Sequence, residues 1–301
     1  MGLIGRTRDL LLKRSGGASP VLDAKYRVET LLAEGGMGAV YVASDLRLDR
    51  EVAVKIVRPE LLPDPAARDR FAREAQTLAR LQHPSIVKVF DVGSLPSGAP
   101  YLVMELVRGG DLRRELAREA RLDPSRARGI LSAVCAALEA AHREGVVHGD
   151  LKPENILLPD EGVEAKVLDF GVAEALRAPE RGLNLGPLGA PMRPLAQMVA
   201  VGTPAYMAPE QLRGEPATPL TDVFSLGVLA YEMLLGTLPF GSGSMAEVSL
   251  AQTRAVSYTG AEPLPPGLVR AVTTALALDA DRRPVTAQAF AHLIGAAAGG
   301  L

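Results

Sequence analysis

The chain has 301 residues, of which 48% are hydrophobic and 23% are charged, and its formal net charge is -2. This length and balance allow a substantial buried core, and they argue against a general binder of polyanions such as nucleic acids. The single cysteine, Cys135, cannot form an internal disulfide, and we expect it to be buried in the apolar run 130–141. No uninterrupted apolar segment is long enough to cross a bilayer, so we expect no membrane anchor and a cytoplasmic location.

The two ends of the chain lack the pattern of a folded segment. Residues 1–20 mix basic side chains with a Ser/Gly-rich stretch, which predicts a flexible tail over residues 1–22, with a docking helix or a contact with an anionic surface as the alternative. Arg6 stands where a myristoylation signal requires Ser or Thr, so lipidation is not expected. We predict a folded region over residues 23–296 and a short C-terminal tail over 297–301.

The first part of the folded region is rich in strand-forming residues. Short β-branched runs predict strands at 40–42, 52–54, 86–89 and 101–103. Between them, residues 65–81 carry apolar side chains at helical spacing, namely Phe71, Ala75, Leu78 and Leu81. This pattern predicts a small β-rich lobe, from about 23 to 106, that contains one helix.

The remainder of the chain has a helical pattern. Helices are predicted at 112–119, 125–144, 221–235 and near 286–294. A run of strands followed by a run of helices indicates an α+β protein. The helical lobe should extend from about 107 to 296.

Five short motifs follow one another along this framework. They are Glu34-Gly35-Gly36-Met37-Gly38, Val52-Ala53-Val54-Lys55, His148-Gly149-Asp150, Asp169-Phe170-Gly171 and Ala208-Pro209-Glu210. In this order and spacing they resemble the bacterial Hanks-type (eukaryotic-like) serine/threonine protein kinase family along nearly the whole chain. The resemblance implies a bilobal protein-kinase-like fold, with ATP bound between the two lobes.

The resemblance assigns the phosphate-binding residues to the first lobe. Glycines let backbone amides approach phosphate oxygens without a Cβ in the way, and the family pattern places Gly35, Gly36 and Gly38 in this role. Lys55 would contact the α and β phosphates and would be paired with Glu74 on the following helix. The first glycine of the family pattern is replaced by Ala33, for which we expect a modest effect on nucleotide affinity.

The adenine site is implied by the resemblance alone. Its apolar walls would come from Leu32, Val40 and Ala53 on one side and Leu157 on the other. Met104 would be the gatekeeper, and the hinge, Glu105 to Val107, would bond the base through its backbone, with Glu105 and Val107 as the contacting residues.

The stretch from Val147 to Leu158 carries the chemistry. Phosphoryl transfer to a hydroxyl needs a carboxylate that orients the nucleophile and takes its proton, and Asp150 matches that base. In the family, the lysine at Lys152 contacts the transferring phosphate and is typical of serine/threonine kinases. Asn155 and Asp169 would bind Mg²⁺, with Mn²⁺ as an alternative. Thr203 would hydrogen-bond Asp150 and Lys152.

Further residues match structural roles in the family. Phe170 is expected in the core, stacked on His148, which makes His148 a packing residue. Glu210 should form a buried ion pair with Arg283. Asp222 should hold the backbone of the catalytic loop, although an acidic residue at a helix N-terminus is also favoured by the helix dipole.

These assignments predict a non-specific serine/threonine protein kinase that acts on Ser/Thr-bearing proteins, with autophosphorylation included and with a signalling role. Residues 202–210 resemble the substrate-docking segment of bacterial serine/threonine kinases. The alternatives are an ATP-binding pseudokinase scaffold, supported only by Ala33 and Gly149, and a small-molecule kinase of related fold, which would not be expected to carry this docking segment. The oligomeric state is left open.

The sequence also predicts how activity is controlled. Most regulated kinases have an arginine before the catalytic aspartate, which pairs with a phosphorylated residue of the activation loop. Here that position is Gly149, and residues 172–202 contain no Ser, Thr or Tyr. Activity is therefore expected not to depend on phosphorylation of this loop, unless Gly149 merely fits a tight backbone turn and the loop composition has drifted.

Overall fold

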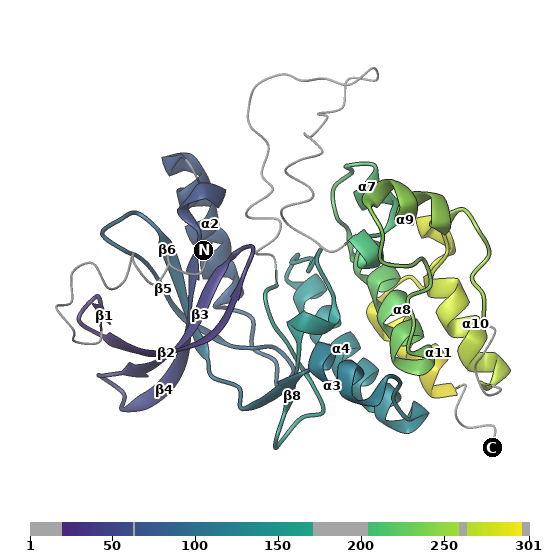
Figure 1. Cartoon of the computed structure of the whole chain (residues 1–301), viewed down its shortest axis with the longest axis horizontal. Coiled ribbons are helices and arrows are strands. Elements are labelled where there is room, and N and C mark those ends of the chain that lie inside the picture. Colours follow the sequence, from purple (N-terminus) through teal and green to yellow (C-terminus); the bar gives the residue numbers. More distant parts are fainter. Residues whose placement is uncertain (1–19, 63, 171–203, 259–263, 297–301) are drawn as a thin grey trace. The chain divides into compact units, whose positions relative to one another are not determined.

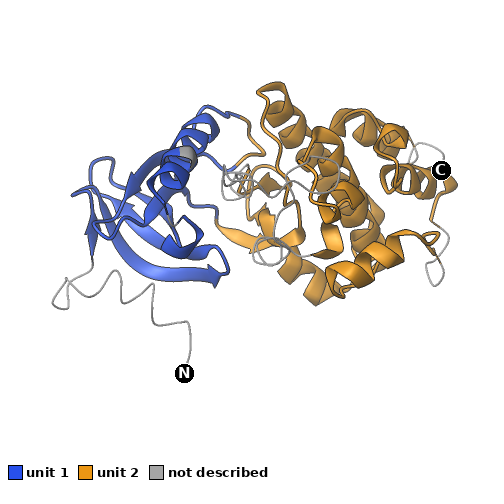
Figure 2. Cartoon of the chain, turned by 90° about the horizontal axis from the view of Figure 1, so that it is seen from above, with its two compact units in different colours: residues 1–82, 87–107, 175–178 blue, residues 83–86, 108–174, 179–301 orange. Residues whose placement is uncertain are grey.

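The computed structural model describes residues 20–62, 64–170, 204–258 and 264–296. Four sets of predictions lie outside these residues: those for the outermost part of the N-terminal tail, for Gly171 and the loop 172–202, for Thr203, and for the tail 297–301. The described chain divides into two compact units (Figure 2). Unit 1 contains residues up to 82 together with 87–107, and unit 2 contains 83–86 and the residues from 108 onward.

Unit 1 is built on one antiparallel sheet with the strand order β1-β2-β3-β4-β6-β5 (Figure 1). In chain order the strands are β1 (Val21–Leu22), β2 (Tyr26–Gly35), β3 (Gly38–Asp45), β4 (Arg50–Val57), β5 (Val89–Ser94) and β6 (Pro100–Glu105). Three of the four predicted strands fall within β3, β4 and β6. The unit therefore confirms the β-rich character expected of the first lobe.

Side chains alternate between the two faces of this sheet. On β4, Val52, Val54 and Ile56 belong to one apolar cluster with Tyr41 and Tyr101 of the neighbouring strands. Because successive residues of a strand point to opposite faces, the residues between them on β4 belong to the other face. One face of the sheet thus packs in the apolar cluster, and Lys55 lies on the other face.

The predicted strand at 86–89 is wrong in its position. The strand β5 begins at Val89, where the prediction ended, and continues to Ser94, pairing with β6. Ile86 makes only an isolated bridge to Val167 in unit 2. The run Ile86 to Val89 has the β-branched, alternating pattern of a strand, but β6 pairs only with its last residue, Val89, and with the residues that follow.

The helix of unit 1, α2 (Pro65–Leu78), begins where the sequence provides a cap. The Asp64 side chain accepts a hydrogen bond from the Ala67 backbone N–H at 2.7 Å, and Pro65 occupies the first helical position. The helix was predicted to reach Leu81, but it ends at Leu78, and the Leu81 N–H bonds the Leu78 carbonyl in a tighter turn. That turn still buries Leu81.

Unit 2 is mainly helical and confirms the α+β class. Its strands β7 (Gly109–Asp111), β8 (Ile156–Pro159) and β9 (Lys166–Val167) form a small antiparallel sheet. Its α-helices are α3 (Leu112–Glu119), α4 (Pro124–Arg143), α7 (Pro209–Leu212), α8 (Pro219–Leu235), α9 (Met245–Gln252), α10 (Pro266–Ala275) and α11 (Ala287–Ala296). Short 3₁₀ turns occur at Pro153–Asn155, Pro204–Tyr206 and Ala280–Arg282, and one in unit 1 at Pro59–Leu61.

Helix α8 is the centre of unit 2. Every residue from Thr221 to Leu234 is buried, and α8 packs against α4, α10 and α11. Cys135 of α4 is also buried, as expected. Among the described helices, none combines the length and the apolar character needed to cross a membrane.

The backbone packing around Gly38 requires a glycine, which the sequence did not reveal. Its φ is +152°, and a Cβ at this position would lie 2.0 Å from the backbone carbonyl oxygen of Ile56 on β4. Gly35, its partner across the hairpin, has nothing within 4 Å of the place where a Cβ would stand. The packing within unit 1 therefore requires glycine at position 38 but not at position 35.

This contrast gives a prediction about stability. Gly38→Ala should lower the free energy of unfolding by about 2–4 kcal/mol, because the new methyl group meets backbone that cannot move aside. Gly35→Ala is the matched control and should change it by less than about 0.5 kcal/mol. Denaturant unfolding of the two variants measures both values, and equal destabilisation would contradict the role given to the Ile56 carbonyl.

Candidate active site

The residues predicted to bind nucleotide from unit 1 share one face of the sheet. Lys55 pairs with Val40 on β3, and Ala53 pairs with Met104 on β6. Because paired residues and residues two apart on a strand point to the same side, these four side chains lie together on the face opposite the apolar cluster. Lys55 is only 5% exposed. Glu74, its predicted partner, lies on α2 of the same unit.

The glycine-rich hairpin is tied to the strand that carries Lys55. The Arg58 backbone N–H, just beyond β4, donates to the Met37 carbonyl at the tip of the hairpin at 3.0 Å. The Arg58 guanidinium also lies 3.8 Å from a carboxylate oxygen of Glu34. Leu32 is 46% exposed on β2. The hairpin is thus fixed at its tip, with Gly36 in the loop between Gly35 and Gly38.

The predicted hinge begins at the end of β6. The Glu105 N–H donates to the Lys88 carbonyl at 2.9 Å, and the Lys88 N–H donates to the Glu105 carboxylate at 3.3 Å. Met104 is buried and Val107 is partly exposed. These bonds fix the backbone of the hinge at its first residue.

In unit 2 the catalytic loop brings three predicted residues together. The Lys152 Nζ donates to Asp150 Oδ2 at 2.7 Å, and Asn155 Nδ2 donates to the Asp150 backbone carbonyl at 2.9 Å. The Leu168 N–H donates to the Asn155 carbonyl at 2.9 Å, which brings Asp169 next to this loop. Leu157 follows on β8, partly exposed. The candidate base, its lysine and both candidate metal ligands therefore belong to one bonded loop system.

His148 is a structural residue, as predicted. Its Nδ1 accepts a hydrogen bond from the Asp150 N–H at 3.2 Å, so the proton of the neutral ring is on Nε2, which donates to the Leu168 carbonyl at 2.9 Å. The ring packs against Phe170 with centroids 5.0 Å apart. With both ring nitrogens hydrogen-bonded and no exposed surface, His148 joins the loop that carries Asp150 to the segment that carries Leu168 and Phe170.

Asp222 holds the backbone of the catalytic loop, which confirms that prediction. Its Oδ2 accepts from the His148 N–H at 2.8 Å and its Oδ1 accepts from the Gly149 N–H at 2.9 Å. His142 Nε2, at the end of α4, also lies 2.8 Å from Oδ2 and is its third donor. His142 was not predicted, because it lies 80 residues from Asp222 in sequence and belongs to no short motif.

Gly149 has a backbone conformation that favours glycine. Its φ is +71°, in the left-handed region, where side chains other than Asn and Asp are rarely found. Its carbonyl accepts from Gln211 Nε2 at 2.8 Å, while Gln211 Oε1 accepts from the Ala208 N–H at 3.0 Å. Gly149 therefore does lie in a tight backbone turn. Gln211, which the sequence did not single out, links the docking segment to this turn.

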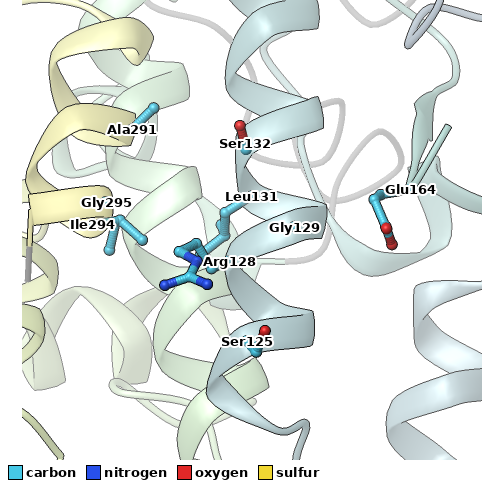
Figure 3. Close-up of a pocket in the computed structure, with 9 residues that line it drawn as sticks. All are labelled: Ser125, Arg128, Gly129, Leu131, Ser132, Glu164, Ala291, Ile294 and Gly295. Carbon is cyan, nitrogen blue, oxygen red and sulfur yellow. The ribbon is translucent and has the colours of Figure 1, made fainter. Parts of the chain in front are cut away.

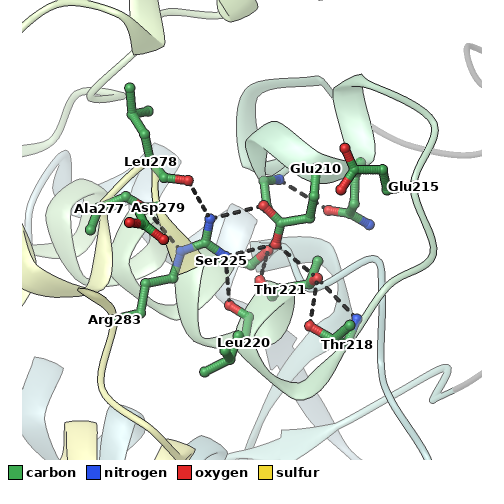
Figure 4. A network of polar contacts seen from close by, with 12 residues as sticks. Glu210, Glu215, Thr218, Leu220, Thr221, Ser225, Ala277, Leu278, Asp279 and Arg283 are labelled. Atoms are coloured by element: carbon green, nitrogen blue, oxygen red, sulfur yellow. Dashed lines mark hydrogen bonds and ion pairs between the residues drawn. The ribbon is translucent and has the colours of Figure 1, made fainter. Parts of the chain in front are cut away.

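The predicted pair of Glu210 and Arg283 is present and buried (Figure 4). Two nitrogens of the guanidinium donate to the two carboxylate oxygens at 2.7 and 2.8 Å. The remaining N–H groups bond the backbone carbonyls of Leu220, Ala277 and Leu278. All five donors of Arg283 are thereby satisfied, as a buried guanidinium requires. Burial is the largest single influence and would raise the pKa of Glu210, but the hydrogen bonds and charge of Arg283, together with hydrogen bonds from the backbone and from Thr221, hold that pKa below its usual value.

The donor set in unit 2 fits a magnesium ion that is shared with phosphates. Because Asn155 Nδ2 is used by the Asp150 carbonyl, its Oδ1 is the atom left for an ion. Asp169 adopts φ +63°, a strained conformation of the kind found at functional sites. Among the described residues no cluster of three or more His, Cys, Asp or Glu side chains could hold a metal alone. One carboxylate and one amide suit Mg²⁺, which takes its other ligands from water and phosphates.

A groove of about 430 Å³ lies elsewhere in unit 2 (Figure 3). Its walls come from α4 and α11, with Glu164 from the connection between β8 and β9. None of its lining residues is among those predicted for the site.

Comparison with known proteins gives a consistent result. A model described as the protein kinase domain matches residues 26–293. The chain is 39% identical over 280 residues to the serine/threonine-protein kinase pkn3 of Myxococcus xanthus, covering 88% of this chain and 48% of that protein. It is 39% identical over 248 residues to the serine/threonine-protein kinase PknB of Mycobacterium tuberculosis, covering 81% of this chain and 37% of the relative. The chain thus spans less than half the length of these curated relatives.

Solved structures give the same fold. The crystal structure of the Mycobacterium tuberculosis PknI kinase domain matches with a TM-score of 0.73 at 26% identity, covering 93% of this chain and 99% of that domain. A second crystal structure of the same kinase domain matches with a TM-score of 0.73 at 26% identity, covering 94% of this chain and 99% of the other. The likeness therefore extends over both units.

The ion pair of Glu210 predicts a pH-dependent stability. Because the pKa of Glu210 is lower in the folded chain, its contribution is present above the glutamate pKa of the unfolded chain, about 4.3, and is lost as the pH falls through the folded value. The difference in free energy of unfolding between the wild type and Glu210→Gln should therefore be largest at neutral pH and shrink under acid conditions. Denaturant titrations across this range measure it, and a difference that stays constant or grows in acid would contradict the account.

Proposed function

The chain belongs to the protein kinase family, and we propose that it is a serine/threonine protein kinase that transfers the γ-phosphate of ATP to hydroxyl groups of protein substrates. The observation that carries the proposal is Asp150, bonded by Lys152 and set on a backbone that Asp222 holds. The printed names of the relatives, which are serine/threonine kinases, support the same choice of substrate.

In this proposal the catalytic loop performs proton transfer and positioning. Asp150 orients the substrate hydroxyl and accepts its proton, while Lys152, held 2.7 Å from that carboxylate, offers its charge to the transferring phosphate. Asn155 and Asp169 would hold Mg²⁺, with Mn²⁺ as an alternative, and the ion would neutralise charge on the phosphate oxygens. Thr203, by resemblance, would bond both Asp150 and Lys152.

The residues of unit 1 would bind and orient ATP. Lys55 would contact the α and β phosphates while Glu74 fixes its position, and Gly35, Gly36 and Gly38 would let backbone amides approach the phosphates. By the resemblance to the family, Leu32, Val40, Ala53 and Leu157 would contact adenine. Met104 would limit the depth of the site, and the backbone of Glu105 and Val107 would bond the base.

We further propose that the enzyme acts on Ser/Thr-bearing proteins in the cytoplasm and that nucleic acids are not its substrates. A pseudokinase scaffold is the less supported reading, because it requires an ordered catalytic loop to have no catalytic use. A phosphotransfer assay on a generic protein, on the chain itself and on small amino alcohols distinguishes the candidates.

The roles of the two aspartates can be separated. Asp150→Asn should lose at least about 100-fold in phosphotransfer rate while binding ATP with magnesium normally, because a base contributes about 10²–10⁴ to rate. Asp169→Asn should lose transfer and also magnesium-dependent ATP affinity, since it would hold the ion. Calorimetric ATP titrations and radiolabelled phosphate transfer measure the two effects. Full activity in either variant would overturn the assignment.

Control by loop phosphorylation is not expected. Gly149 supplies no cation for a phosphate, and residues 172–202 contain no hydroxyl side chain to carry one. Enzyme treated with a phosphatase should therefore keep its initial rate. A large loss of rate that preincubation with ATP restores would contradict this prediction.

A further inference from the structure

Arg113 lies at the centre of a polar cluster that no predicted role explains. It is on α3, and its Nε donates to Glu154 at 2.9 Å while its Nη1 donates to Glu232 at 2.7 Å. Its Nη2 donates to the Tyr206 hydroxyl, which in turn donates to Glu232 at 2.5 Å. We call Arg113, Glu154, Tyr206 and Glu232 the Arg113 cluster. All four residues belong to unit 2.

The Arg113 cluster borders the catalytic loop. Glu154 lies in the turn Pro153–Asn155, directly between Lys152 and Asn155, the two residues that bond Asp150. Tyr206 lies in the segment 202–210, which resembles the part of the family that docks the substrate. A peptide whose hydroxyl reaches Asp150 must therefore pass close to this cluster.

The cluster carries two carboxylates and one guanidinium. Burial raises the pKa of Tyr206, and its hydrogen bond to Glu232 raises it further, so that the phenol stays neutral. The net charge is thus negative even with Arg113 in place. The Glu154 side chain is 44% exposed and that of Arg113 is 36% exposed, so solvent and a bound peptide reach the cluster from this side, whereas Glu232 is 9% exposed.

We propose that Arg113 is a specificity-determining residue. Its guanidinium pairs with Glu154 and Glu232, two carboxylates that would otherwise be open to a basic side chain of the substrate. The inference rests on the proposed kinase function and deepens it. With Arg113 in place, Glu154 and Glu232 already have a cation, and a substrate arginine gains little by approaching them. The remaining negative charge does not attract acidic substrates either. The enzyme should therefore show little charge preference at this position.

Removing the guanidinium tests the proposal. Arg113→Met keeps an unbranched apolar side chain and removes the guanidinium, whose Cζ lies 5.9 Å from the centroid of the Tyr206 ring, together with its charge and donors. Its neighbour Arg114 is the matched control, because it is 74% exposed, lies on the same helix and pairs only with Asp111 among the salt bridges described. The substrates are Ser/Thr peptides in which a single arginine is placed at each position on either side of the acceptor residue in turn. The readout is kcat/KM for each arginine peptide divided by kcat/KM for the peptide with alanine at the same position.

Arg113→Met should raise this ratio about tenfold at one peptide position, since a hydrogen-bonded charge pair is worth about 1.5–3 kcal/mol and tenfold corresponds to about 1.4 kcal/mol. The wild type and Arg114→Met should have ratios near one at that position. Adding Glu154→Gln to Arg113→Met should remove most of the gain. An unchanged ratio in Arg113→Met, or an equal rise in Arg114→Met, would overturn the proposal.

A second variant keeps the test decisive if Arg113→Met does not fold. Glu154→Gln alone removes an exposed charge and leaves Arg113 facing one carboxylate, so peptides that carry a glutamate should gain several-fold relative to alanine peptides. No shift would contradict the inference. If the wild type phosphorylates no peptide or protein at all, the proposed kinase function fails, which is a different result from a kinase whose ratios do not change.

Discussion

The buried carboxylate of Asp222 is the constraint on which the candidate site depends. It has no exposed surface, and it accepts hydrogen bonds from two consecutive backbone N–H groups and from His142. A buried charge is costly unless such donors surround it, so the loop and the helix stabilise each other. Because the two N–H groups belong to the residues just before Asp150, the position of the candidate base is set by α8.

Further contacts from α7 and α8 extend this arrangement. Gln211 joins the docking segment to the Gly149 carbonyl, and the Ser225 hydroxyl on α8 donates to the Tyr206 carbonyl at 2.9 Å. Thr221 donates to Glu210, whose other partner is Arg283. The catalytic loop and the docking segment are thus both hydrogen-bonded to α8. Because α8 is buried along nearly its whole length, the support that it provides is rigid.

The sequence predicted the parts of this site that lie in short motifs. Asp222, Arg283 and the pair of His148 and Phe170 were found because the resemblance to the kinase family implies a role for each of these positions. His142, Gln211 and Arg113 were missed, since each lies on a helix where a polar residue is usually solvated and their partners are far away in sequence. The strand at 86–89 was misplaced because a β-branched run does not say which residues the next strand will pair with. Gly38 was assigned to phosphate binding, whereas the approach of the Ile56 carbonyl already requires a glycine there.

The most direct test of this account is the phosphotransfer rate of Asp222→Asn. The amide keeps the shape of the side chain but presents an NH₂ group in place of one acceptor, so one of the loop N–H groups loses its partner. The account predicts a fall in rate of about 100-fold, as expected for a misplaced catalytic group, with the affinity for ATP and magnesium retained in a protein that still unfolds cooperatively. A folded variant with the wild-type rate would contradict it.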